Sequence, residues 1–223
     1  MSNGAPQDEG KLERQFKHPL RSNFPRGSSA WAVRRAQWRA LGISDADMEK
    51  PKIAVVNSSS ELAICFSHLD GVAKAVKEAI RAAGGLPFEI RTTAPADFIF
   101  SPGARGGWIL ASRDLVAADI EAQVEGPQLD GMVCLTSCDK TVPGQLMAAA
   151  RTNVPTIFVI CGYQQSGEID GHHVDIEDVF LTAGHVAAGT QDAETLAAMS
   201  EVAVRGPGVC SGMGTANSMH VVT

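Results

Sequence analysis

The 223-residue sequence has no long apolar run and no apolar stretch near its start. A membrane-spanning helix needs about 20 mostly apolar residues, and a secretory signal peptide needs an apolar core behind a basic start. Neither pattern is present, because residues 1–29 are polar with scattered proline and glycine. We therefore expect no membrane contact, a flexible N-terminal arm over residues 1–29, and a cytoplasmic location in which thiols stay reduced.

Positive charge is also scarce, and the cysteines have no close partners in the sequence. Nineteen Lys and Arg residues stand against 25 Asp and Glu, a net charge of −6 that argues against nucleic acid as the main partner. A small anionic substrate is still compatible, because an acidic protein can carry a locally positive site. The five cysteines are odd in number and include no Cys-x-x-Cys pair, so a disulfide framework is not indicated.

Apolar runs and helical periodicity alternate along the chain and predict an α/β fold. The expected strands span residues 53–56, 87–92, 132–135 and 155–162. The expected helices span residues 30–41, 69–83, 113–124, 145–151, 176–188 and 193–202, with Ser112 as the N-cap of the third. Strand, loop, helix and strand in succession form a parallel unit with a right-handed crossover. We predict a mostly parallel sheet flanked by helices.

The loop after the strand at 132–135 carries three different reactive side chains, in Cys138-Asp139-Lys140. Ligands of open parallel sheets bind outside the carboxyl ends of the strands, where this loop would lie. A thiolate suits an iron–sulfur cluster, zinc or nucleophilic attack, and a carboxylate suits Mg²⁺ or Ca²⁺. The lysine could lower the thiol pKa or pair with an anion. A plain loop with a buried cysteine, a capping aspartate and a solvated lysine is about equally compatible with these residues.

Other candidate ligands follow the same strand-to-helix pattern. Cys65 and His68 lie in the polar loop 57–68, and a Cys-x-x-His pair can ligate zinc. Asp97 follows the strand at 87–92, where a lone aspartate is more often a turn residue. Cys210 lies in the glycine-rich segment 205–218, before a helix expected to begin near residue 212, where a thiolate is favoured. That segment satisfies neither the dinucleotide-binding fingerprint nor the phosphate-loop motif.

The remaining thiols and imidazoles have simpler interpretations. Cys134 and Cys161 lie inside apolar strands and are expected to be small buried hydrophobic residues. A redox dithiol of Cys134 and Cys138 is the least favoured alternative, because residues four apart on a strand and its loop are too distant to bridge easily. His172 and His173 lie in the polar stretch 164–175 and are more typical of an exposed loop than of a metal site.

Cys65, Cys138 and Cys210 thus share one context, a loop that precedes a helix. The sequence around them resembles that of the dihydroxy-acid and sugar-acid dehydratases. The matching segments are residues 57–69, 138–155, 175–189 and 210–219. The Cys-Asp-Lys and Cys-Ser-Gly-Met segments are highly specific, and the resemblance extends from about residue 21 to the end of the chain. It implies the N-terminal α/β domain of a family whose C-terminal β-rich domain is absent from this chain.

The resemblance implies two inorganic cofactors. A [2Fe–2S] cluster would be held by Cys65, Cys138 and Cys210, and one iron with an open position suits a Lewis acid. Mg²⁺ would be held by Asp97, Asp139 and Lys140. In this family the lysine is typically carbamylated, which makes it an oxygen ligand that a hard cation accepts. Asp139 and Lys140 are also the residues of this chain expected to be catalytic.

The implied reaction is the loss of water from a 2,3-dihydroxy carboxylate, a branched-chain or a sugar acid, which yields a 2-oxo acid. The family's serine base and a further acidic Mg²⁺ ligand lie in a C-terminal half that this chain lacks. Residues 30–223 would form the cluster-bearing domain, and the helix that stops at Thr223 suggests a truncated domain. A homodimer or homotetramer acting on a small molecule is implied. The alternative is a non-catalytic metal-binding domain that acts through a partner.

The sequence departs from the family pattern in one loop. Asp97 is followed by Phe98 where the family commonly has glycine, and the Gly-Met of the following loop is replaced around Arg105-Gly106. This loop helps to line the substrate site in the family. The departure therefore indicates a divergent branch and leaves the identity of the dihydroxy acid open.

Overall fold

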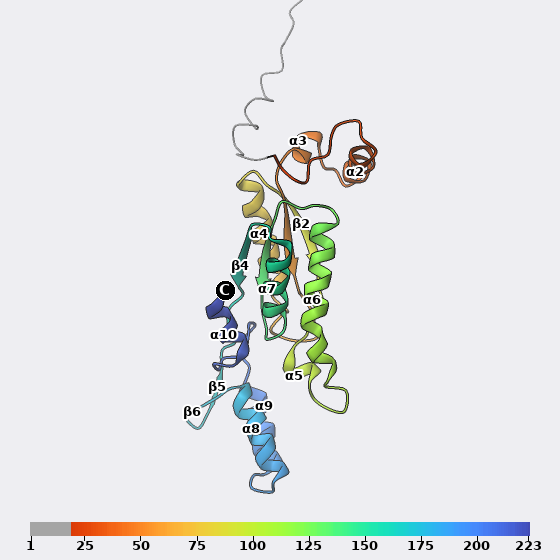
Figure 1. Ribbon diagram of the computed structural model, residues 1–223. Coiled ribbons are helices and arrows are strands. Elements are labelled where there is room, and N and C mark those ends of the chain that lie inside the picture. The colour runs from red at the N-terminus through yellow and green to blue at the C-terminus, as the bar shows by residue number, and fades with distance from the viewer. Residues whose placement is uncertain (1–18) are drawn as a thin grey trace, which may run out of the picture.

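The computed structural model describes residues 19–223, and its centre is a four-stranded parallel sheet (Figure 1). The strands are β1 (Lys52–Asn57), β2 (Leu86–Arg91), β3 (Gly131–Thr136) and β4 (Thr156–Ile160). Their spatial order is β2-β1-β3-β4, and every neighbouring pair is parallel. The predicted α/β fold with a parallel sheet is confirmed, and each predicted strand is present with its bounds shifted by at most two residues.

Helices cover both faces of this sheet. Helices α6 (Trp108–Glu125) and α7 (Thr141–Thr152) pack together on one face, and α4 (Leu69–Ala82) covers the other. Val56 of β1 joins the core beneath α6, whereas its neighbour Val55 joins the core beneath α4. This alternation follows from the two-residue period of a strand, and burial on both faces explains why the central strands β1 and β3 are largely apolar.

The segment before the sheet is attached to the loop that follows α6. Arg21 donates from Nε to the Leu129 carbonyl oxygen at 2.6 Å and pairs with Glu125 at 2.8 Å. Next come α2 (Ser29–Ala40), whose first turn is capped by Ser28, and the short α3 (Asp45–Met48). An arm was predicted over residues 1–29, and residues 1–18 of it lie outside the described residues. The contacts of Arg21 hold the described part of this segment against the sheet domain.

A smaller lobe follows β4 and extends beyond the end of the sheet where α5 (Asp97–Phe100) lies (Figure 1). It contains the hairpin of β5 (Gly167–Ile169) and β6 (His172–Val174), then α8 (Ile176–Ala187) and α9 (Ala193–Val202). The chain then returns toward the sheet and ends with α10 (Thr215–Val222). The two helices were predicted, but the hairpin was not, because its strands are short and polar. Within residues 19–223 no helix is both long and apolar enough to cross a membrane.

Three helix starts differ from the predictions. Ser112 is not an N-cap, because α6 begins four residues earlier at Trp108, and the Ser112 hydroxyl instead donates to the Ile109 carbonyl oxygen at 2.6 Å. Helix α7 begins at Thr141 rather than at residue 145, since Pro143 is tolerated in a first helical turn. Helix α10 begins at Thr215 rather than near residue 212.

Candidate metal centre

The loops that follow β1 and β3 meet at the carboxyl end of the sheet. The buried hydroxyl of Ser137 donates to the Cys65 carbonyl oxygen at 2.6 Å and so joins the two loops. Cys138 adopts a left-handed backbone with φ of 66°, a conformation that costs a non-glycine residue about 1–3 kcal/mol and is enriched at functional sites. Cys65 and Cys138 share one buried cluster. Ser137 had not been predicted to matter, and its only signal was its position beside Cys138.

Cys210 reaches the same region from the smaller lobe. Val209 forms a parallel bridge with Tyr163 just after β4, and its N–H donates to the Gly162 carbonyl oxygen at 3.0 Å. The side chain of Asn217 then donates to the carbonyl oxygens of Cys210 at 2.7 Å and Gly212 at 2.6 Å. These bonds set the path of the Cys210 loop, which places its thiol within electrostatic range of Cys138.

The three thiols differ in how readily they ionise. The pKa of Cys138 is lowered by the neighbouring Cys65 thiol, despite the burial of Cys138. The backbone N–H groups of Asp97 and Asp139 lower this pKa further. Contact with Cys138 and burial raise the pKa of Cys65. Burial, followed by the charge of Cys138, raises the pKa of Cys210 to about 12. Cys138 is therefore the thiol that is best placed to be a thiolate before any metal arrives.

Two carboxylates and a lysine lie next to the thiols. Lys140 donates from Nζ to Asp97 Oδ2 at 2.9 Å and to Asp139 Oδ2 at 2.7 Å. Burial and the neighbouring Asp139 carboxylate raise the pKa of Asp97 to about 6. Burial also disfavours the charged forms of Asp139 and Lys140. The hydrogen bonds and opposite charges of the two side chains outweigh this effect, so the pKa of Asp139 is lowered and the pKa of Lys140 is raised. Asp97 Oδ1 is buried and has no hydrogen-bond partner in the described chain.

This donor set fits both cofactors that the resemblance implies. Soft sulfur ligands and hard oxygen ligands lie side by side, because Cys138 and Asp139 are adjacent in one loop. The unpartnered oxygen of Asp97 and its raised pKa mark a carboxyl group that a cation would stabilise. All six side chains are at least half-buried, which limits the access of water to the site. A set of this kind can hold a thiolate-bound metal group and a hard cation at one place.

The spacing of the Cys65, Cys138 and Cys210 sulfurs bears on whether a single ion could bind all three. Across residues 19–223, the one trio of Cys, His, Asp and Glu ligand atoms that all lie within 4.8 Å of one another is that of His173, Asp175 and Asp178. At least one pair among the sulfurs of Cys65, Cys138 and Cys210 therefore lies more than 4.8 Å apart. A tetrahedral zinc ion with Zn–S bonds of about 2.3 Å holds its sulfurs about 3.8 Å apart. A single zinc ion bound to all three thiols would thus require the loops to move closer together.

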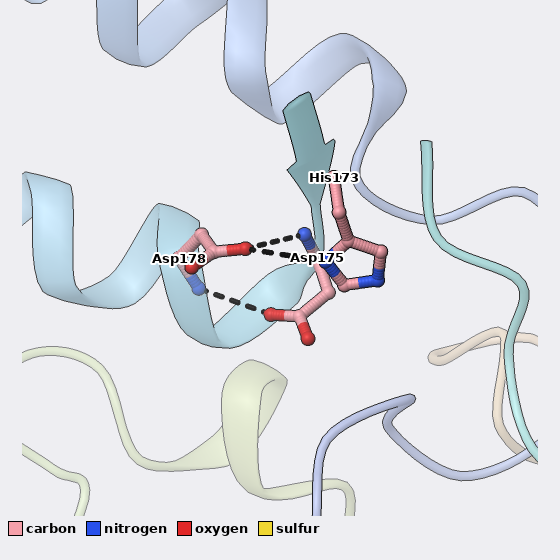
Figure 2. Close-up of side chains that lie close together, drawn as sticks. All are labelled: His173, Asp175 and Asp178. Carbon is pink, nitrogen blue, oxygen red and sulfur yellow. Dashed lines mark hydrogen bonds and ion pairs between the residues drawn. The ribbon is translucent and has the colours of Figure 1, made fainter. Parts of the chain in front are cut away.

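The trio of His173, Asp175 and Asp178 has a structural explanation (Figure 2). Asp175 is the N-cap of α8, and its Oδ1 accepts the N–H groups of Glu177 at 2.8 Å and Asp178 at 3.1 Å. Asp178 Oδ2 in turn accepts the Asp175 N–H at 2.9 Å, which completes a capping box. His173 is exposed, and its Nδ1 lies 3.9 Å from Asp178. These oxygens are already used to begin the helix, so we assign no metal to them.

Cys134, Cys161 and His68 have other contacts in the described chain. Cys134 joins the buried cluster beneath α6 and α7, whereas Cys138 joins the cluster beneath α4. A dithiol between them is thus unsupported, because their side chains lie on opposite faces of the sheet. His68 Nε2 donates to the Cys161 carbonyl oxygen at 2.8 Å, and this bond holds the imidazole between α4 and the end of β4. Burial raises the pKa of the Cys161 thiol to about 12.

The fold and the site together are those of an α/β domain whose ligand site lies at the carboxyl ends of parallel strands. The sequence profile described as "Dihydroxy-acid/6-phosphogluconate dehydratase N-terminal" matches residues 50–223. This chain belongs to the dihydroxy-acid/6-phosphogluconate dehydratase family, as its motifs had indicated.

Similar curated proteins come from archaea and bacteria. The dihydroxy-acid dehydratase of Methanococcoides burtonii is 41% identical over 204 residues, which is 92% of this chain and 37% of that protein. The dihydroxy-acid dehydratase of Pyrococcus abyssi is 39% identical over the same shares. That of Desulfitobacterium hafniense is 44% identical over 192 residues, 86% of this chain and 34% of that protein. The chain thus spans just over a third of the length of these relatives.

Proposed function

We propose that this chain is the cluster-bearing part of a hydro-lyase that converts a 2,3-dihydroxy carboxylate to a 2-oxo acid. The observation that carries the proposal is the meeting of three loops at one end of the sheet, where Cys65, Cys138 and Cys210 lie beside a group of oxygen ligands. Family membership supports the dehydratase chemistry. The substrate is a small branched-chain dihydroxy acid or sugar acid, and the working protein is a cytoplasmic homodimer or homotetramer.

In this proposal each ligand has a defined role. Cys65, Cys138 and Cys210 hold a [2Fe–2S] cluster, while Asp97, Asp139 and a carbamylated Lys140 hold Mg²⁺. When bound, the cluster supplies a Lewis acid for the departing hydroxyl, and Mg²⁺ supplies a positive charge for the substrate carboxylate. The adjacency of Cys138 and Asp139 in one loop and the unpartnered oxygen of Asp97 support this division into soft and hard ligands.

The charges of the chain's own residues support the carbamate of Lys140. In the metal-free protein the Lys140 ammonium neutralises Asp97 and Asp139 through its two ion pairs. Carbamylation removes that cation and leaves three anionic oxygen groups close together. Such a group requires a divalent cation, because three buried negative charges repel one another. Lysine modification and Mg²⁺ binding are therefore expected to depend on each other.

We further propose that the base that removes the C2 proton is supplied from outside this chain. The curated relatives are nearly three times as long as the matched segment, which covers 37% of the dehydratase from M. burtonii. Asp139 and Lys140 would act within this chain by holding and orienting the substrate's carboxylate and 2-hydroxyl through Mg²⁺. Turnover thus requires the remaining family sequence together with these residues.

Anaerobic reconstitution with iron and sulfide tests the cluster assignment. The wild-type chain should become brown and retain about two irons. The variant C138S should lose the colour and most of the iron, whereas C134S is the matched control, because that thiol lies beneath the opposite face of the sheet. A wild-type chain that stays colourless and free of iron would contradict the proposal. A loaded protein that includes the missing family sequence but cannot dehydrate dihydroxy acids would favour the alternative, a non-catalytic metal-binding domain.

A further inference from the structure

The carboxylate of Glu177, in helix α8, lies against the loop that carries Cys210. The Glu177 carboxyl carbon and one oxygen lie 2.6 Å, and the other oxygen 2.7 Å, from the point where a Cβ on Gly212 would lie. One oxygen lies 3.0 Å from the corresponding point on Gly214. The carboxylate therefore occupies space that exists only because both residues lack a side chain. A glycine-rich loop of this kind lets a charge approach the backbone beside Cys210 closely.

The carboxylate of Glu177 is not used to begin its helix. Asp175 and Asp178 form the capping box of α8, and Glu177 contributes only its backbone N–H to that cap. Among residues 19–223 the Glu177 side chain takes part in no hydrogen bond and no ion pair, unlike Glu89, Glu121 and Glu125. Its negative charge is thus uncompensated and directed at the loop. This charge also contributes to the raised pKa of Cys210, after burial and the charge of Cys138.

We propose that Glu177 is a positioning residue that lowers the reduction potential of the cluster held by Cys65, Cys138 and Cys210. The inference rests on the proposed function. Reduction adds negative charge to the cluster, and a nearby carboxylate disfavours that addition. A cluster that serves as a Lewis acid benefits from remaining oxidised, because ferric iron attracts a hydroxyl oxygen more strongly than ferrous iron does. Nothing in the sequence pattern had drawn attention to Glu177.

The structural alternative is that Glu177 only stabilises the start of α8, since acidic residues interact favourably with helix N-termini. The chain provides a matched control for this role. Glu194 is the second residue of α9 and follows the N-cap Asp192, just as Glu177 is the second residue of α8 and follows the N-cap Asp175. Glu194 is exposed, and its carboxylate is absent from the groups that act on the Cys210 thiol. The variants E177Q and E194Q therefore remove the same charge from equivalent helix positions.

The test is a redox titration of the reconstituted chain in which the visible absorption of the cluster is monitored. We expect the potential of E177Q to shift in the positive direction from wild type and that of E194Q to stay at the wild-type value. Equal potentials in wild type, E177Q and E194Q would overturn the inference while leaving the cluster assignment intact. Failure of the wild-type chain to load a cluster would overturn both.

A second variant separates charge from shape. In G212A the three atoms nearest to the new methyl group belong to the end of the flexible Glu177 side chain, so the carboxylate must move away while its charge is retained. We expect a positive shift in potential that is smaller than that of E177Q. G212A also carries the test if E177Q does not assemble a cluster. An unchanged potential in G212A with the wild-type cluster spectrum would contradict the proposed close approach.

Discussion

At the scale of single residues, this protein keeps charged groups in places where burial works against them. Lys52 is 1% exposed, and its ammonium donates to Asn23 near the start of β1. Burial lowers the pKa of Lys52 to about 8, even though Asp130 and Glu49 act in the opposite direction. Lys140 shows the contrasting outcome, because two carboxylates contact its ammonium directly and its pKa is raised. Direct ion pairs therefore decide whether the pKa of a buried lysine is raised or lowered.

Lys52 leads to a prediction about pH. Its pKa in the unfolded chain is near the ordinary lysine value of 10.5, above the folded value of about 8. Between these values the unfolded state binds more protons, so the lysine's contribution to stability rises with pH across this window. Below pH 8 the variant K52M should be more stable than wild type by roughly 1–3 kcal/mol, and the advantage should shrink as pH approaches 10.

Urea unfolding at pH 7.5 and pH 10 checks this prediction. Only the difference between wild type and variant is compared, so that other titrating groups cancel. K74M is the control, because it removes an exposed lysine on α4 in place of a buried one. A free-energy difference for K52M that is the same at both pH values would refute the assignment.

At the scale of elements, the site depends on how closely α6 and α7 pack. Helix α7 begins directly after Cys138-Asp139-Lys140, so its position sets the position of that loop. Gly144 in its first turns is buried against α6, and a Cβ there would lie 2.8 Å from Val116 and 2.9 Å from the Arg113 carbonyl oxygen. The glycine thus permits a close approach of two helices, although glycine lowers intrinsic helix stability by about 1 kcal/mol.

A pair of glycine variants tests this packing. G144A should destabilise the domain by about 1–3 kcal/mol, because the new methyl group meets backbone and a branched side chain that cannot move freely. Gly184 in α8 has no atom within 4 Å of its would-be Cβ, so G184A should stabilise the domain by up to about 1 kcal/mol. Chemical denaturation measures both. The packing argument fails if the two substitutions change stability in the same direction.

At the scale of the whole molecule, the three cysteines come from parts of the chain with little else in common. Cys65 and Cys138 belong to loops of the sheet, whereas Cys210 returns from the smaller lobe of β5, β6, α8 and α9. That lobe contacts the sheet domain through the bridge between Tyr163 and Val209 and through the aromatic pair of Phe98 and Phe180. A cluster bound to all three thiols would add a strong link between the two parts.

This link predicts a gain in stability on loading. A group that binds only the folded state raises the unfolding temperature by mass action. The reconstituted chain should therefore melt at a higher temperature than the metal-free chain and resist proteolysis between residues 163 and 210. C210S should lose this gain, whereas C134S should keep it. Calorimetry and limited proteolysis of the two forms measure the effect, and identical melting of loaded and metal-free chains would argue against the link.

Local pattern alone was enough to predict the strands, most helices and the family. Each of these depends on residues close together in the chain: apolar runs, helical spacing and the Cys-Asp-Lys and Cys-Ser-Gly-Met segments. The errors were local as well. Helix α6 begins at Trp108, and the Ser112 hydroxyl donates to the Ile109 carbonyl oxygen within the helix instead of capping it.

The arrangement of the site required the folded chain. Residues 65, 138 and 210 approach one another because parallel strands in the order β2-β1-β3-β4 end at the same edge of the sheet. Sequence spacing does not contain that order, since it results from burying both faces of the sheet beneath helices distant in the chain. Sequence spacing also does not show that the Glu177 carboxylate lies against Gly212. Nor does it show that Cys134 and Cys138 belong to buried clusters on opposite faces of the sheet. Long-range packing, which no short segment encodes, brings these groups together or keeps them apart.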